Sequence, residues 1–215
     1  MTVTETAEDA DTQTEGDELT FSQLVFKLAE ILDVPQQLKL NEIDHSKLQA
    51  LMDRYKSKDS DWSRYALQEK SKGYTRNGVV NFGDNANLLV LVWNPGKGSA
   101  IHDHAGAHCV MKILQGELQE ELFENPSEEG PMKCFDKHIL PRDGTRYIND
   151  KIGVHRVTNQ GTIPAVSLHL YTPPYAMKYG CNTFSENAGR KSHVDMSMLY
   201  SWQGTVVNRS MYSTC

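Results

Sequence analysis

The first clear hydrophobic pattern along the chain has the period of a helix. Its apolar residues share one face at 3.6-residue spacing: Phe21, Leu24, Val25, Leu28, Ile31 and Leu32. Thr20 and Gln23 resemble a capping box at the start of this helix, and Pro35 lies beyond its end. Two shorter helical patterns follow, one around Leu51 and one around Trp62. We therefore predict a helical segment over residues 19–68.

After about residue 70 the pattern changes to short β-rich runs separated by turn residues. The predicted strands cover residues 74–80, 88–93, 101–104, 109–114, 117–123, 134–139, 146–148, 155–158 and 165–171. Many short strands between frequent turns are typical of a sandwich or a small barrel. Helices followed by a long all-β section favour a mainly β fold, in which a barrel over residues 69–200 carries an N-terminal helical cap.

The two ends of the chain give weaker patterns. Residues 1–18 are acidic and hold few large apolar groups, which predicts a disordered tail. Residues 201–215 give little periodic signal, and we expect them to form a loosely ordered C-terminal tail.

Composition narrows the range of partners and compartments. The net charge of the 215-residue chain is −6 and there is no basic block, so nothing in it favours nucleic-acid or anionic-membrane binding. No apolar run is long enough to span a bilayer, and the polar, acidic start is unlike a signal peptide. The four cysteines are scattered without a C-x-x-C pair. We therefore expect a cytoplasmic protein.

A pair of histidines is the first candidate for chemistry. His102 and His104 stand two residues apart in a predicted strand, so both side chains can point to one face and hold one metal ion. Imidazole suits zinc, copper, iron or nickel, so the pair does not identify the metal. The alternative is two surface histidines on an exposed strand.

A second candidate is the polar row formed by Ser167, His169 and Tyr171, which alternate with leucines in another predicted strand. If this face is the barrel interior, the three groups must satisfy one another's hydrogen bonds. The alternative is a solvent-facing polar stripe.

Tyr74 and Arg76 likewise share one face of a predicted strand. A guanidinium there can bind a carboxylate through two hydrogen bonds, whereas the more common fate of an arginine is a surface ion pair.

Residues 96–116 read G-x5-H-x-H-x4-C-x6-G, which resembles the first motif of the cupin superfamily of small jelly-roll barrels. Cys109 stands where most cupins have a glutamate ligand. Residues 153–159 resemble the end of the second cupin motif, which makes His155 the natural third ligand. Three neutral imidazoles without a carboxylate leave the site more positive and favour an anionic ligand such as a thiolate. A zinc hydrolase or lyase also satisfies this ligand count.

Several longer segments, spread over residues 60–175, closely resemble the eukaryotic cysteine dioxygenases. They are YTRN at 74–77, the tryptophan at 93, IHDH at 101–104, HCVMKILQG at 108–116, YINDKIGVHRV at 147–157 and AVSLHLYTPP at 165–174. The resemblance implies a cupin barrel with one Fe(II) per chain, held by His102, His104 and His155. It also implies conversion of L-cysteine and O2 to 3-sulfinoalanine (cysteine sulfinic acid), in cysteine catabolism toward taurine and sulfate.

The same resemblance implies roles for further residues. Arg76 matches the arginine that binds the substrate carboxylate, with Tyr74 assisting, and Tyr171 matches the active-site tyrosine. Cys109 matches the cysteine that forms a thioether bond with that tyrosine. The remaining matches are to pocket residues or to the polar row behind the tyrosine: Trp93, Ser167, His169 and Met196.

Other activities stay open on the residues alone. One is a dioxygenase for another small carboxylated thiol such as 3-mercaptopropionate, and another is a non-redox metal-binding cupin, for example a zinc or manganese isomerase or lyase. A third is a binding module without catalysis. Arg76 favours a carboxylated substrate over cysteamine. We expect a monomer.

Overall fold

The computed structural model describes residues 18–126 and 130–207 of the chain. The predicted acidic tail, apart from Glu18, lies outside the described residues, and so does the end of the predicted C-terminal tail, residues 208–215.

Helices form the first part of the chain, as the hydrophobic pattern predicted. The helical elements here are α1 (Phe21–Leu32), η1 (Leu40–Glu42), α2 (His45–Arg54), α3 (Asp59–Trp62) and η2 (Ser63–Tyr65). The capping box at the start of α1 is confirmed. Gln23 N donates to Thr20 Oγ1 over 3.2 Å, and Thr20 N donates to Gln23 Oε1 over 2.9 Å. These bonds satisfy backbone groups that a helix start otherwise leaves without partners.

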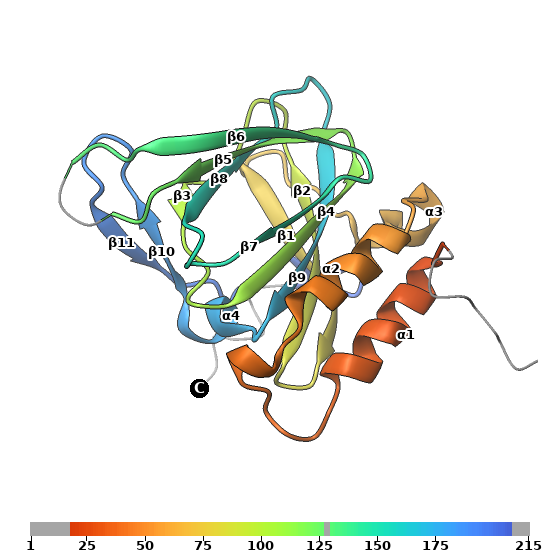
Figure 1. Ribbon diagram of the computed structural model, residues 1–215. Coiled ribbons are helices and arrows are strands. Elements are labelled where there is room, and N and C mark those ends of the chain that lie inside the picture. Colours follow the sequence, from red (N-terminus) through yellow and green to blue (C-terminus); the bar gives the residue numbers. More distant parts are fainter. Residues whose placement is uncertain (1–17, 127–129, 208–215) are drawn as a thin grey trace, which may run out of the picture.

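The rest of the chain is mainly β, as expected, and forms two curled sheets (Figure 1). The larger sheet has the order β13-β12-β1-β2-β9-β4-β7 and the smaller one the order β11-β10-β3-β8-β5-β6. The strands are β1 (Tyr74–Phe82), β2 (Ala86–Trp93), β3 (Ile101–His102), β4 (His108–Gln115), β5 (Glu117–Phe123), β6 (Cys134–Pro141), β7 (Thr145–Ile148), β8 (Val154–Thr158), β9 (Ala165–Thr172), β10 (Cys181–Phe184), β11 (Lys191–Val194), β12 (Ser201–Trp202) and β13 (Thr205–Val206). A short helix, α4 (Tyr175–Tyr179), follows β9.

The larger sheet is covered on both faces, which explains the continuous apolar run of β2. Leu88 and Val90 pack with the helices in one cluster, whereas Leu89, Leu91 and Trp93 pack in a second cluster inside the barrel. Successive side chains of a strand point to opposite faces, so a strand buried on both sides needs apolar residues throughout. This inner cluster leaves part of the barrel interior for polar residues.

The C-terminal boundary of the barrel differs from the prediction. We expected residues 201–215 to form a loosely ordered tail, but β12 and β13 belong to the larger sheet. β12 pairs in parallel with β1, where Asn77 is the register partner of Ser201 and Gly78 that of Trp202. A strand of two residues cannot satisfy its backbone hydrogen-bonding groups alone. Its partner is β1, which is distant in the sequence. The pattern also did not predict α4, β10 or β11.

Candidate metal centre

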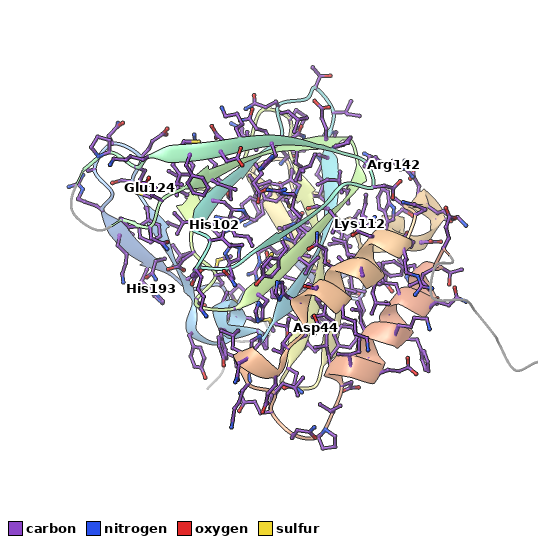
Figure 2. All side chains as sticks on the ribbon, viewed as in Figure 1. Asp44, His102, Lys112, Glu124, Arg142 and His193 are labelled. Carbon is purple, nitrogen blue, oxygen red and sulfur yellow. The ribbon has the colours of Figure 1, made fainter. Side chains whose placement is uncertain are left out.

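The structure brings three histidines together inside the barrel. His102 lies on β3 (Figure 2). It is the register partner of His155 on β8, and His104 follows two residues after His102. Their candidate ligand atoms all lie within 4.8 Å of one another. β3 ends at His102, so strand alternation does not place His104. Its backbone N–H instead donates to Asp150 Oδ1 over 2.7 Å.

Hydrogen bonds select the free ring nitrogen of two of these histidines. His102 Nδ1 donates to the backbone oxygen of Ala100 over 3.0 Å, and His155 Nδ1 donates to Glu120 Oε1 over 2.8 Å. A carbonyl or carboxylate oxygen can only accept, so each Nδ1 carries the hydrogen and each Nε2 keeps its lone pair. Metal-binding histidines are oriented in this way by the group on their other nitrogen.

The buried atoms of the site fit a metal ion. Within the described part of the chain, His104 Nε2 is buried and has no hydrogen-bond partner, whereas His104 Nδ1 lies 3.6 Å from Asp150 Oδ1. Burial and the neighbouring histidines hold the pKa of His102 and of His155 well below the ordinary value, so both rings are neutral. Neutral imidazoles with free lone pairs are what a metal requires. An unpaired buried nitrogen is costly unless it finds such a partner.

Glu120 is a contact of the site that we did not predict. It is almost fully buried on β5, and its second oxygen, Oε2, accepts from Arg146 Nε over 3.2 Å. Burial raises the pKa of Glu120 and the adjacent Arg146 opposes that rise. The sequence did contain a signal, because Glu120 stands between Leu118 and Leu122 at period two. An acid in the inward row of a strand indicates a buried partner.

We expect Glu120→Gln to weaken metal binding by about 10- to 100-fold, because the amide keeps the shape but loses the charge that makes His155 a stronger donor to a metal. The measurement is an anaerobic Fe(II) titration against a competing chelator.

Glu121→Gln is the matched control. Glu121 follows on the same strand but pairs outside the barrel with Arg156 (2.7 Å) and Lys137 (2.8 Å). Its Fe(II) affinity should equal that of the wild type. Equal Fe(II) affinities in the wild type, Glu120→Gln and Glu121→Gln would show that Glu120 does not contribute to metal binding.

The polar row of β9 faces the barrel interior, so the alternative of a solvent-facing stripe is wrong. Ser167 is 0% and His169 3% exposed. Trp93 Nε1 donates to Ser167 Oγ over 2.8 Å, and Ser167 Oγ lies 2.8 Å from His169 Nε2. His169 Nδ1 lies 3.1 Å from the hydroxyl oxygen of Tyr171. The groups satisfy one another in a continuous chain that ends at Tyr171.

Cys109 lies directly across from Tyr171. The two residues are register partners on β4 and β9, and their side chains pack together in a small buried cluster. Burial raises the pKa of the Cys109 thiol and also that of the Tyr171 hydroxyl. Both groups are therefore protonated near neutral pH.

Arg76 lies at the pocket and not in a surface ion pair. It is half-buried and belongs to none of the ion pairs found in the described residues. Its Nη1 donates to the backbone oxygen of Met196 over 2.6 Å. Tyr74, two residues earlier, stacks on Trp93 with ring centroids 4.6 Å apart.

One pocket unites most of the residues singled out from the sequence. Its lining includes His102, His104, His155, His169, Tyr171, Tyr74, Arg76, Trp93 and Met196. Cys109 and Ser167 are not part of this lining and lie behind Tyr171 and His169. Cys181 lines the pocket as well, and sequence reasoning missed it because it is a lone cysteine without a motif. Burial raises the pKa of Cys181 to about 11.

The amino-acid sequence matches one family of known proteins. Residues 13–187 match the family Cysteine dioxygenase type I. The chain is 40% identical to Cysteine dioxygenase type 1 of Homo sapiens over 173 residues, which is 79% of this chain and 84% of that protein. It is 42% identical to the Bos taurus protein over the same shares, and 40% identical to the Danio rerio protein over 75% of this chain and 80% of that protein.

Solved structures give a looser likeness. A Thermus thermophilus protein aligns with a TM-score of 0.41 at 20% identity, over 53% of this chain and 94% of that chain. A Klebsiella pneumoniae protein with a double-stranded β-helix domain aligns with a TM-score of 0.42 at 16% identity, over 60% of this chain and 86% of that chain.

Proposed function

The chain belongs to the cysteine dioxygenase type I family, and from this premise we propose that it converts L-cysteine and O2 to cysteine sulfinic acid (3-sulfinoalanine). The observation that carries the proposal is the joint presence, in one pocket, of the three-histidine group and of an arginine without an ion-pair partner among the described residues. The three-histidine group, with its metal ion, would bind the thiol of the substrate, and the arginine would bind its carboxylate.

We propose one Fe(II) per chain, held by His102, His104 and His155. Ferrous iron in this position would supply open coordination positions and the redox chemistry that joins dioxygen to sulfur. Glu120 and the backbone oxygen of Ala100 keep two of the rings in the required orientation.

Arg76 would bind the substrate carboxylate. The carbonyl of Met196 takes up one of its N–H groups, so the others remain for two parallel hydrogen bonds to a carboxylate. Tyr74 would assist from the same face of β1. Holding the carboxylate fixes where the thiol lies relative to the histidines, in the bound substrate as well as in the transition state.

Tyr171 would donate a hydrogen bond into the pocket. An indole N–H only donates, so Ser167 accepts from Trp93 and its own hydroxyl hydrogen is free for His169 Nε2. The ring hydrogen of His169 then sits on Nδ1 and points at the Tyr171 oxygen. The hydroxyl hydrogen of Tyr171 is left for the substrate or for dioxygen. Burial keeps the pKa of His169 well below its ordinary value, which holds the ring neutral in this chain.

We further propose a thioether bond between Cys109 and Tyr171. Their direct opposition across β4 and β9 supports it. Forming the carbon–sulfur bond removes the thiol hydrogen and one ring hydrogen, and the two electrons pass to dioxygen. The bond would fix the phenol where the polar row holds it.

Cys109→Ala should lower turnover several-fold without abolishing it, because Tyr171 keeps its hydrogen bond to His169 but loses a fixed position. Steady-state oxygen uptake at saturating L-cysteine measures this effect. Mass spectrometry of the wild type should show a chain lighter by two hydrogen atoms, and this loss should be missing in the variant. Complete inactivity with metal retained would show that Cys109 does more than support Tyr171.

The proposed function is tested by oxygen uptake of the iron-loaded protein with L-cysteine, with the product identified by mass. One O2 consumed per cysteine, with both oxygen atoms in the sulfinate, is the expected result. No uptake with iron bound would overturn the proposal. The ratio of kcat/KM for L-cysteine and 3-mercaptopropionate distinguishes the two carboxylated substrates.

We also propose a cellular compartment, an oligomeric state and a fate for the product. We infer a cytoplasmic enzyme, because Cys134 and Cys181 are free thiols, as a reducing compartment would keep them. No helix in the described ranges is long and apolar enough to cross a bilayer. We also propose that the enzyme is a monomer. The sulfinate product would enter cysteine catabolism toward taurine and sulfate.

A further inference from the structure

The segment from residue 195 to residue 206, which we call the C-terminal strap, lies beside Arg76 and includes β12 and β13 at the edge of the larger sheet. Arg76 is in contact with it twice. Its Nη1 donates to the backbone oxygen of Met196 over 2.6 Å, and its backbone oxygen accepts from Tyr200 N over 2.8 Å. The strap therefore contacts both the guanidinium and the backbone of one residue.

Three contacts outside the pocket anchor the strap to β1. Ser201 Oγ donates to Asn77 Oδ1 over 2.7 Å, and both residues are fully buried. Trp202 lies over Gly78, where a Cβ would come within 2.2 Å of the indole ring. A glycine at this position thus leaves room for Trp202. Gln203 N also donates to the backbone oxygen of Gly78 over 2.8 Å.

The hydrogen bond to the Met196 carbonyl orients Arg76 without neutralising its charge. A carboxylate partner would cancel the charge of the guanidinium, whereas the carbonyl of Met196 is an uncharged acceptor that fixes one N–H group. A free arginine side chain carries about 2 kcal/mol of rotamer entropy, and a guanidinium that is already fixed loses less on binding a ligand. Tyr74, Arg76 and Met196 line both the metal pocket and a groove on its outer side, so the strap also forms a wall between them.

We propose that the C-terminal strap is a specificity-determining element: it positions Arg76 for a substrate carboxylate and so sets the preference for carboxylated thiols over thiols with an amine alone. Met196 is the positioning residue at the pocket, and Ser201 and Trp202 hold it there. This inference rests on the proposed function.

Loosening the anchor should therefore weaken carboxylate binding without touching the metal centre. In Trp202→Ala we expect the KM for L-cysteine to rise about tenfold while kcat changes less than about twofold, because only an interaction shared by ground state and transition state is lost. Ser201→Ala, a smaller change, should shift the KM in the same direction by about threefold, as the loss of one buried hydrogen bond permits.

Cysteamine serves as the probe without a carboxylate. Its inhibition constant against L-cysteine should be the same in the wild type and in both strap variants. Trp202→Phe keeps an aromatic ring over Gly78 and should restore the wild-type KM. Phe135→Ala removes an exposed aromatic residue from β6, outside the strap and the pocket, and should leave every constant unchanged. Iron content and melting temperature are measured for each protein.

Two outcomes would overturn the proposal. One is an unchanged KM for L-cysteine in folded, iron-loaded Trp202→Ala and Ser201→Ala. The other is an equal loss for L-cysteine and cysteamine, which would point to general damage of the pocket. If the iron-loaded wild type does not turn over L-cysteine, the proposed function fails. Anaerobic calorimetric titration of L-cysteine into wild type and Trp202→Ala then tests the strap, with weaker binding by the variant supporting it and equal binding overturning it.

Discussion

Replacing His155 by alanine should remove the metal from the protein and destabilise the fold at the same time. The metal is lost because two imidazoles remain where three converge within 4.8 Å. The fold loses stability because Glu120, 1% exposed, is deprived of the N–H donor to Oε1. Leaving a buried carboxylate oxygen without its hydrogen-bond donor costs about 1.5 to 3 kcal/mol. We expect the lower figure, since Arg146 still donates to the other oxygen.

The two effects can be separated by a second substitution. Iron content is measured by elemental analysis, and the free energy of unfolding by denaturant titration of the metal-free proteins. In the double variant His155→Ala/Glu120→Leu the buried carboxylate is gone, so stability should partly return while the metal stays absent. Wild-type iron affinity in His155→Ala would place the metal elsewhere in the chain.

Arg76→Ala should raise the KM for L-cysteine about 100-fold with little change in melting temperature. Losing a charged partner of a buried carboxylate typically costs about 2 to 5 kcal/mol, and 100-fold corresponds to about 2.7 kcal/mol. The fold should tolerate the change, since the Arg76 side chain makes one hydrogen bond, to the Met196 carbonyl, among the described residues. Steady-state oxygen uptake over a range of L-cysteine concentrations measures the effect.

Arg76→Lys is the informative companion. A lysine keeps the charge but cannot form the two parallel bonds of a guanidinium, so most of the KM defect should remain. Recovery of the wild-type KM in the lysine variant would show that charge alone is recognised. An unchanged KM for L-cysteine in Arg76→Ala would show that Arg76 does not bind the substrate.

Much of the fold could be read from local patterns. The capping box of Thr20 and Gln23, the helical face that includes Leu24 and Leu28, and the predicted strands all have counterparts in the structure. These features depend on residues near one another in the chain, and the periods 3.6 and 2 report them directly. The pattern also indicated that Ser167, His169 and Tyr171 share one face, although it left open whether that face is buried.

Part of the candidate metal centre could be predicted from the sequence. His102 and His104 form a local motif, but His155 and the role of Arg76 came from resemblance to a family and not from spacing. Nothing in the local pattern connects position 155 with position 102, because register between strands is set by how the whole sheet assembles.

Local sequence patterns do not predict which distant segments come into contact. Alternation places Glu120 in an inward row, but its partner His155 belongs to the neighbouring strand β8. Residues 201–206 carry too few positions to show a period, yet they extend the larger sheet because Ser201 meets Asn77, 124 residues earlier. Periodicity states which face of a strand a side chain occupies. Which strand lies opposite is decided when the chain closes into a barrel and most buried polar groups find a partner.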